Sequence, residues 1–481
     1  MSALNAALEA LQWAILAYFV IVNGALTLHS LSAAGDVRRH RLDAWQESRW
    51  RLLRSNLTPT ISMLVPAHNE ELTIRESVRS FLTLRYPSLE IVVANDGSSD
   101  GTLDVLRDEF DLVPVTPMFR KAIGTAPVRG VWRSRRHPSL VVVDKENGGR
   151  ADALNAALNV ATGDLVCAVD ADTLIDAEGL LRLVRPFLTD EGCVGAGGTI
   201  RAVNGCQVRA GRVVRARVSR KPLVALQAVE YLRAFEVGRV GWNRLGGNLI
   251  ISGAFGLFRR EQMIAAGGYR HGSLAEDMDL VATMRRRAYE DGTPGRIVFI
   301  PDPVAWTEVP ETLGNLARQR SRWHNGLLEV LRRHRRLVFN PRYGSLGMVV
   351  VPYYVIVELL APIVEFAGLV SLALGLALGA INWPFAILFF LVAYGWGALL
   401  TLFAVGLDEW TYRSYGGLGD RLVLFGYALV EGIGYRQLTI FWRLQGIWNS
   451  LRGRTEWGAM TRSGFATTDA VTEPAEPALR S

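Results

Sequence analysis

The chain has 481 residues, of which 49% are hydrophobic, and its formal net charge is +7. This length allows one or two domains together with membrane helices, and the basic charge is typical of arginines on the cytoplasmic side of a membrane protein. We find no recognisable nucleic-acid-binding module, so we expect no nucleic-acid partner. The three cysteines lack the spacing of a zinc site or of a disulfide framework.

The first predicted element is an apolar run from Leu11 to Leu31, close to the roughly 20 residues that cross a bilayer core. A cleaved signal peptide is the alternative, but residues 1–10 contain no Lys or Arg and therefore lack its positive n-region. Three arginines follow the run, in residues 38–41, which predicts that the next domain is cytoplasmic. We assign residues 1–36 to an N-terminal transmembrane helix.

We assign residues 37–310 to a cytoplasmic domain, and between Thr58 and Pro310 strand patterns alternate with helical patterns. Strands are predicted at Ser62–Pro66, Glu90–Asn95, Leu140–Asp144, Leu165–Val169, Val194–Ile200, Leu249–Phe258 and Arg296–Ile300, and helices at Glu71–Leu84, Ala151–Ala161 and Glu276–Tyr289. This alternation predicts a doubly wound, mostly parallel α/β sheet, whose ligands lie beyond the carboxyl ends of the strands. The basic stretch 115–138 interrupts the pattern, either as a solvated loop or as a contact with anionic headgroups or a partner.

Acidic side chains follow two of the predicted strands. Asp170 and Asp172 come directly after an apolar strand, where carboxylates suit a hard divalent cation. An ordinary turn is the alternative for a pair of this kind. Asp96 ends another strand and is free to accept a hydrogen bond from the N–H of a base. Because the chain has neither GxGxxG nor GxxxxGK[ST], we expect a metal to hold the phosphates.

Basic residues surround a glycine pair just before a predicted helix. Lys145 and Arg150 bracket Asn147-Gly148-Gly149. Surface charge is one interpretation, but basic groups near the start of a helix also suit an anionic ligand. We predict that Lys145 binds a nucleotide.

Two adjacent acids begin the helical pattern at Glu276. Acids at this position are favoured by the helix dipole, and we accept that role for Glu276. For Asp277 we predict a general base, which takes the proton from an acceptor hydroxyl during the attack.

An arginine-rich helix carries Gln319, Arg322 and Trp323. Arg322 can neutralise charge that develops on a leaving diphosphate, and the flat ring of Trp323 can stack on a sugar. An amphipathic helix that lies on the membrane is a second interpretation, and the two are compatible. We assign residues 311–345 to this helix and to further interfacial helices.

About three further spans are predicted in residues 346–445, at Met348–Leu378, Phe385–Leu407 and, less clearly, Arg421–Trp442. Arginines after the last run leave the side of the C-terminus open. Glu358 and Glu365 lie seven residues apart on one face of the first of these spans. Carboxylates in lipid usually face a bundle or a polar path, so the two are candidates for lining a channel, with pairing to arginine or helix packing as alternatives. Residues 446–481 are assigned to an interfacial segment and a disordered tail.

Four motifs in this order resemble the signatures of the membrane-embedded, processive family 2 glycosyltransferases, which include cellulose, hyaluronan, chitooligosaccharide and poly-N-acetylglucosamine synthases. The motifs are Asp96, Asp170-x-Asp172, Glu276-Asp277 and Gln319-x-x-Arg322-Trp323. The resemblance extends from about Pro59 through the transmembrane region. Departures are Ala275, where Thr is usual, and the insertion 115–138.

The resemblance implies a GT-A fold, a UDP-sugar donor, Mg²⁺ or Mn²⁺, and inversion to a β-linked product. The site residues that it implies are Asp96 on the uridine, Asp170 and Asp172 on the nucleotide and metal, Asp277 as base, Arg322 on the diphosphate, and Ser252, Gly253, Ala254, Gln319 and Trp323 on the acceptor. It implies a multi-pass protein of a bacterial-type inner (plasma) membrane, with a cytoplasmic catalytic domain, that extends a growing glycan and passes it across the bilayer.

Several alternatives stay open at this point. A non-processive transferase that acts on a lipid-linked acceptor would carry the same motifs. A catalytically silent receptor or scaffold would have lost its acids, which are intact here. The identity of the sugar, accessory subunits and a homo-oligomer are not decided by the sequence.

Overall fold

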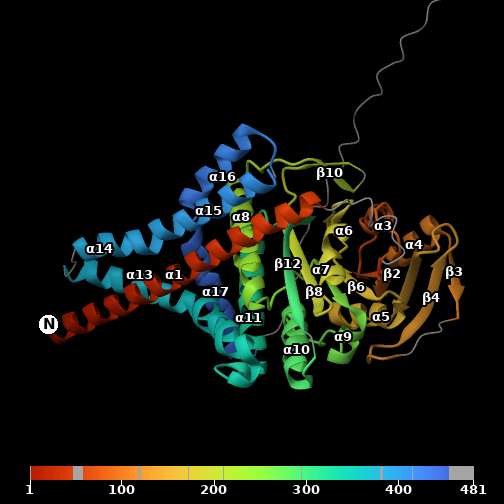
Figure 1. Ribbon diagram of the computed structural model, residues 1–481, viewed down its shortest axis with the longest axis horizontal. Coiled ribbons are helices and arrows are strands. Elements are labelled where there is room, and N and C mark those ends of the chain that lie inside the picture. Colours follow the sequence, from red (N-terminus) through yellow and green to blue (C-terminus); the bar gives the residue numbers. More distant parts are fainter. Residues whose placement is uncertain are drawn as a thin grey trace, which may run out of the picture.

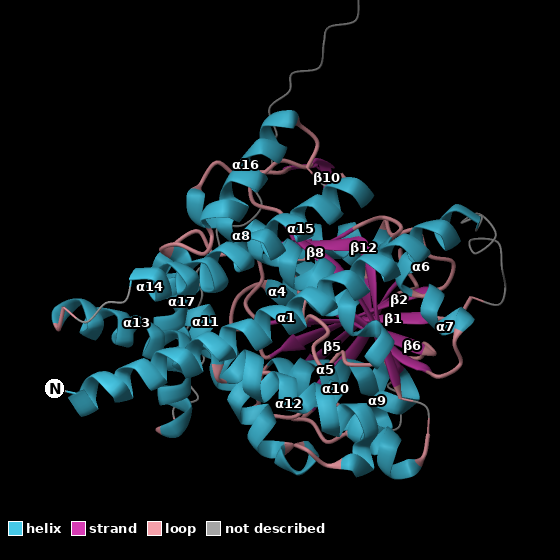
Figure 2. Cartoon of the chain, turned by 60° about the vertical axis from the view of Figure 1, so that its left-hand side comes forward, coloured by secondary structure: helices cyan, strands magenta, loops and turns pink. Residues whose placement is uncertain are grey.

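The computed structural model describes residues 2–46, 58–116, 121–171, 173–209, 211–293, 295–379, 383–413 and 415–453. A sheet with its covering helices forms one half, and long helices extend from it (Figure 1). Figure 2 shows that the strands are confined to the first half, while α13, α14 and α17 lie on the other side. Helix α1 (Ser2–Gln46) begins at the far end of the long helices and reaches the sheet (Figure 1).

Among the described residues, ten strands form one sheet in the order β3-β4-β5-β2-β1-β6-β11-β8-β12-β7. Their bounds are β1 Ile61–Ala67, β2 Leu89–Asp96, β3 Leu112–Val115, β4 Val128–Ser134, β5 Leu140–Lys145, β6 Leu165–Val169, β7 Leu174–Ile175, β8 Cys193–Ala202, β11 Phe255–Arg259 and β12 Arg296–Thr307. Strands β5, β2, β1 and β6 are parallel neighbours, as are β8 and β12. Strand β11 lies antiparallel between β6 and β8. The predicted fold class, a mostly parallel α/β sheet with a helical region, is therefore confirmed.

Helices cover both faces of the sheet. One group comprises α3 (Ile74–Leu82), α4 (Thr102–Phe110), α6 (Gly179–Leu183) and α7 (Arg185–Thr189), and the other α5 (Arg150–Val160), α9 (Arg260–Ala266) and α10 (Glu276–Asp291). Figure 1 places α3, α4 and α6 above the sheet and α5, α9 and α10 below it. Strands β1 and β2 are buried along most of their length, as expected for parallel strands with both faces covered.

The seven predicted strands all appear, with three differences. Strand β11 begins only at Phe255, because residues 249–254 form a loop that turns toward α10. Strand β12 continues past Ile300 to Thr307, where it pairs with β8. The basic stretch 115–138 contributes β4, which pairs antiparallel with β5 and extends the sheet at its edge. Residues 117–120 of that stretch lie outside the described part of the chain.

The helical half contains three segments that are long and apolar enough to cross a membrane, within the described residues: Ala6–Leu42, Leu346–Ala377 and Trp383–Thr411. The second comprises η5 (Leu346–Val350), α12 (Val351–Tyr353), η6 (Tyr354–Leu359) and α13 (Ala361–Ala377), and the third α14 (Trp383–Phe390), η7 (Leu391–Gly395) and α15 (Trp396–Thr411). Large apolar side chains on their outer surface are exposed, including Ile21, Leu376 and Leu399. A continuous apolar surface of this kind marks a lipid or protein contact.

The less clear predicted span, Arg421–Trp442, is not one continuous helix. It is divided between α16 (Leu418–Val430) and α17 (Tyr435–Leu451), with a break at residues 431–434 in which Gly434 has φ +80°. Helix α17 packs along α11 (Leu313–Arg333). A Cβ at Gly446 would lie 2.4 Å from the Ser321 carbonyl oxygen, so the two helices approach closely here. The predicted boundaries at 36 and 445 fall inside α1 and α17.

A second set of elements joins the two halves. Its members are the hairpin β9 (Gln207–Arg209) and β10 (Arg212–Arg215), α8 (Pro222–Leu232), the π-helical η1 (Arg233–Arg239), η2 (Val240–Leu245), η3 (Arg335–Leu337) and η4 (Pro341–Tyr343). Segments α8 and η1 pack against α15, and η1 and η2 against α1. Of residues 446–481, predicted as an interfacial segment and a disordered tail, 454–481 lie outside the described residues.

Candidate active site

The acidic motifs meet at one edge of the sheet. Strand β2 ends at Asp96 and its parallel neighbour β5 ends at Lys145, directly opposite, and Asp170 follows β6. Beside these strand ends lies a cavity of about 2300 Å³. It continues between the long helices, so it has a sheet end, lined by Asp96, Asp170 and Asp277, and a helix end, lined by Tyr18, Glu358 and Glu365.

Arg150, the first residue of α5, joins three of the motif segments at the sheet end. Its Nε and Nη2 donate to Asp170 Oδ1 at 3.0 and 2.7 Å, and Nη2 also donates to the Gly253 carbonyl at 2.7 Å. Its Nη1 pairs with Glu276. Burial lowers the pKa of the Arg150 guanidinium, but the charges of Asp170 and Glu276 raise it by more, so the pKa lies above its ordinary value. The sequence predicted that Arg150 lies near an anionic ligand. Its contacts with three distant segments are seen only in the structure.

Asp277 lies beside this arginine at the start of α10. A Cβ at Gly253 would be 3.3 Å from Asp277 Oδ2, so the glycine leaves space at the carboxylate. Burial, followed by the charge of Glu276, raises the pKa of Asp277 to about 6. A carboxylate with this pKa is ionised at neutral pH and is a stronger base than an exposed aspartate.

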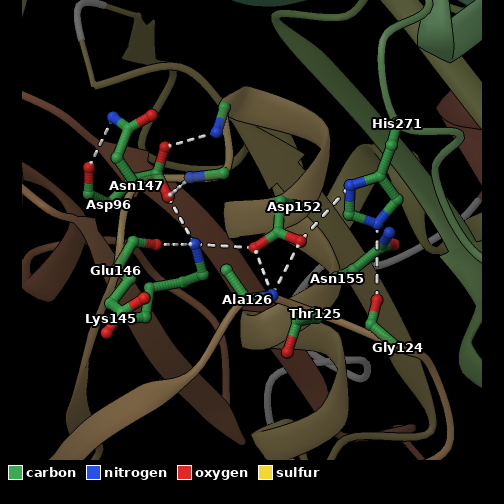
Figure 3. Close-up of polar contacts among 12 residues, drawn as sticks. Asp96, Gly124, Thr125, Ala126, Lys145, Glu146, Asn147, Asp152, Asn155 and His271 are labelled. Carbon is green, nitrogen blue, oxygen red and sulfur yellow. Dashed lines mark hydrogen bonds and ion pairs between the residues drawn. The ribbon is translucent and has the colours of Figure 1, made fainter.

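Asp96 and Lys145 belong to a network of buried polar contacts (Figure 3). The carboxylate of Asp96 accepts hydrogen bonds from Lys145 Nζ at 2.5 Å and from the amides of Gly148 and Gly149 at 3.0 and 2.8 Å. Lys145 is fully buried and its Nζ also lies 2.6 Å from Asp152 Oδ1. This network holds the loop before α5 and thereby positions the helix that begins with Arg150.

The roles predicted for this pair therefore stay predictions. Asp96 lines the cavity, but the protein itself occupies both oxygens of its carboxylate. Lys145 does not line the cavity and directs its ammonium group into the network. His271 extends the network, with Nδ1 3.3 Å from Asp152 Oδ2 and Nε2 3.3 Å from the Gly124 carbonyl (Figure 3). It connects the loop that precedes α10 to the same framework.

The three motif residues on α11 line the cavity together. Gln319 is buried, and its Oε1 has no hydrogen-bond partner among the described residues. The ring of Trp323 is 43% exposed, and the guanidinium of Arg320 lies 4.6 Å from its centroid. Burial lowers the pKa of Arg322, while the nearby carboxylate of Glu276 opposes that effect. This side of the cavity combines a cation with an aromatic surface and an available amide oxygen.

The residues present fit a divalent cation held mainly by a substrate. Asp170 is partly exposed at the cavity and uses Oδ1 for Arg150. Asp172, the other predicted metal ligand, lies outside the described residues. Within the described residues there is no cluster of three or more His, Cys, Asp or Glu side chains placed to hold a metal. Mg²⁺ needs no such cluster, because it is usually held by one or two carboxylates, waters and substrate phosphates.

Ser252, Gly253 and Ala254, for which an acceptor-binding role is predicted, also line the cavity. At the helix end, Glu365 accepts two hydrogen bonds from Arg436 on α17, at 2.9 and 2.6 Å. This pairing with arginine is one of the alternatives that the sequence left open. Glu358 lines the same part of the cavity. The structure thus brings the described site residues, except Lys145, to one continuous cavity.

Comparisons with known proteins found similar sequences and structures. The chain is 27% identical to "Probable glycosyltransferase YdaM" of Bacillus subtilis (strain 168), over 63% of both chains. It is 28% identical to "Poly-beta-1,6-N-acetyl-D-glucosamine synthase" of Staphylococcus aureus (strain COL), over 57% of this chain and 56% of the relative. The chain thus spans less than two thirds of the length of these curated relatives.

Among solved structures, the mannosyltransferase PcManGT from Pyrobaculum calidifontis is similar with a TM-score of 0.48 and 22% identity, over 86% of this chain and 98% of that chain. The sequence model "Glycosyl transferase family 2" matches residues 62–261, and "Glycosyl transferase family group 2" matches residues 165–402. Together the two models cover most of the chain and include all four motifs. The resemblance is therefore confirmed, and the chain belongs to the family 2 glycosyltransferases, as a relative of the polysaccharide synthases.

Proposed function

We propose that this enzyme transfers a sugar from a UDP-sugar to the end of a β-linked glycan, and that the growing glycan leaves between the long helices. The continuous cavity carries this proposal. It joins Asp170, Asp277 and Arg322 at the sheet end to Glu358 and Glu365 at the helix end. A transferase with a small, soluble acceptor would need only the sheet end.

The reaction follows from the charges at the sheet end. Asp277 removes the proton from an acceptor hydroxyl while that oxygen forms a bond to the anomeric carbon of the donor. The bond from that carbon to the diphosphate breaks on the opposite face, so the configuration inverts and UDP leaves. Arg322 and Arg150 neutralise negative charge beside the leaving group. The proton remains on Asp277 until the product moves.

A divalent cation fits the same site. Asp170, together with Asp172, would hold Mg²⁺ or Mn²⁺ against the donor diphosphate. When bound, the ion would supply positive charge to the leaving UDP. Asp96 would contact the uracil at the far end of the nucleotide.

The long helices support a membrane location. We propose that α1, the segment Leu346–Ala377 and the segment Trp383–Thr411 cross a bacterial inner membrane, with the sheet half in the cytoplasm. Their apolar outer surfaces suit lipid, and the arginines that follow the apolar part of α1 favour the cytoplasmic side.

The test uses the purified full chain in detergent with Mg²⁺ and either UDP-N-acetylglucosamine or UDP-glucose. The first donor is chosen because one relative is named for a polymer of N-acetylglucosamine. We expect one donor to release UDP and to give products longer than ten sugars by mass spectrometry. Asp277→Asn is the inactive control.

Two outcomes would contradict the proposal. UDP release from neither donor would reject the transferase reaction with these sugars. Products that stop at one or two sugars and partition into organic solvent would favour transfer to a lipid-linked acceptor. In sealed vesicles that contain the enzyme, glycan that resists an added external glycosidase would support passage across the membrane.

A further inference from the structure

One wall of the cavity is formed by three residues that the sequence motifs do not include. Tyr231, Phe235 and Arg239 lie four residues apart along α8 and η1, and all three line the cavity. This spacing places side chains on one face of a helix. Segment η1 is π-helical, a conformation that is often found at functional sites.

Arg239 is held by aromatic rings rather than by acids. Its guanidinium lies 4.2 Å from the centroid of the Phe235 ring and 5.7 Å from that of Phe299. Its Nη1 is buried and has no hydrogen-bond partner among the described residues. Arg150, in contrast, uses its donors on Asp170, Glu276 and a carbonyl. Arg239 therefore offers an unused donor in a fixed orientation.

Charged groups from both ends of the cavity act on Arg239. Arg239 is close enough to Asp277 for its positive charge to lower the pKa of that carboxylate. Glu358 and Tyr354, at the helix end, act on the Arg239 guanidinium in turn. The diphosphate side of Asp277 already has Arg150 and Arg322. Because Arg239 lines the same cavity as Asp277 and Glu358, its unused donor can serve an acceptor bound there.

We propose that Arg239 is an acceptor-binding residue, which donates hydrogen bonds to oxygens of the terminal acceptor sugar and turns its hydroxyl toward Asp277. The planar guanidinium stacked on Phe235 presents its donors at fixed angles, which a flexible lysine would not do. The inference rests on the proposed function, because it requires a sugar acceptor in this cavity.

The experiment separates transfer to an acceptor from hydrolysis of the donor. Initial rates are measured with UDP-N-acetylglucosamine at saturation and a β-1,6-linked N-acetylglucosamine pentamer at varied concentration, and UDP release is measured without the pentamer. Arg239→Gln is expected to raise the KM for the pentamer about ten- to hundredfold, the effect of losing a charged hydrogen bond. UDP release without the pentamer should fall less than transfer to the pentamer does, and Arg239→Lys should give a KM between those of wild type and Arg239→Gln.

The matched control is Arg286→Gln on α10, which pairs with Glu290 at 3.1 Å and does not line the cavity. Thermal unfolding checks that each variant is folded. An unchanged KM in both Arg239 variants would overturn the inference, as would an equal loss of transfer and of acceptor-independent UDP release. Wild-type enzyme that releases no UDP from any donor would instead reject the proposed function.

Discussion

At the sheet end of the cavity, one arginine connects several motif segments, whereas at the helix end charged side chains form separate pairs across neighbouring helices. Arg150 connects Asp170, Glu276 and the loop that contains Gly253 through several hydrogen bonds. At the helix end, Glu365 pairs with Arg436 and Glu431 pairs with Arg233, and all four line the cavity. A reaction requires groups at fixed positions, whereas a surface along which a chain moves must not hold any one sugar tightly.

The largest expected effect comes from Asp277, the proposed base. Asp277→Asn should lower the rate of UDP release by at least about 10³-fold, because the amide cannot accept the proton. The same variant should be at least as stable as wild type at pH 8. Burial raises the pKa of Asp277 to about 6 in the folded protein, so the stability that the protonated carboxyl contributes at low pH is lost as pH rises through about 6. The neutral amide of Asn has no such loss. Activity and melting temperature measured together check this, and a variant that loses both would contradict it.

The next effect concerns the buried network under the sheet end. Lys145→Met leaves Asp96 and Asp152 buried without their cation, which should cost about 3–5 kcal/mol. Lys121→Met is the control, because Lys121 is exposed and donates to a carbonyl at 3.2 Å; a change of about 0.5 kcal/mol or less is expected. Denaturation in detergent measures both. Equal stability of the two variants would mean that the network does not hold the sheet end.

The pH dependence of the rate tests the link between the two ends. With the pKa of Asp277 raised to about 6, the rate should fall about tenfold for each pH unit below that value. The positive charge of Arg239 lowers this pKa. Arg239→Gln removes that charge and should therefore move the inflection of the pH–rate profile to higher pH. Initial rates from pH 4 to 9 measure this, and an inflection near the pKa of an exposed aspartate would argue against burial of the base.

At the helix end, Glu365→Gln should destabilise the protein by about 1–3 kcal/mol, because the Arg436 guanidinium is left without its carboxylate beside the candidate membrane segment Leu346–Ala377. The double variant Glu365→Leu, Arg436→Met should recover most of this loss. Glu9→Gln, on an exposed position of α1, is the control. Melting temperatures in detergent measure these effects. If the loss of stability in the double variant equals the sum of the losses in the two single variants, the two residues act independently.

The smallest effect tests how closely α17 and α11 pack. Gly446→Ala would place a methyl group 2.4 Å from the Ser321 carbonyl and should cost about 1–2 kcal/mol through overpacking. Gly426→Ala on α16 meets no atom within 4 Å and should stabilise by up to about 1 kcal/mol. Opposite shifts in melting temperature are expected, and a shift of the same sign in both variants would contradict the close approach.

Much of the sheet end could be predicted from the sequence. Short apolar runs followed by acids mark parallel strands whose carboxyl ends meet, so Asp96 and Asp170 were correctly expected at one edge. The strand β4 was missed because its basic residues resemble a loop, and only its pairing with β5 makes it a strand. The connecting role of Arg150 was missed because its partners lie 20, 103 and 126 residues away along the chain.

The amino-acid sequence by itself determined the family, the sheet with its alternating helices, and the apolar segments, because each depends on short motifs or on local periodicity. Only the tertiary structure decided that Lys145 points into a buried network, that Glu365 pairs with Arg436, and that Arg239 faces the cavity. Those outcomes depend on which distant side chains share a buried space. Hydrogen bonds and charges must be satisfied there by whatever the fold brings within reach.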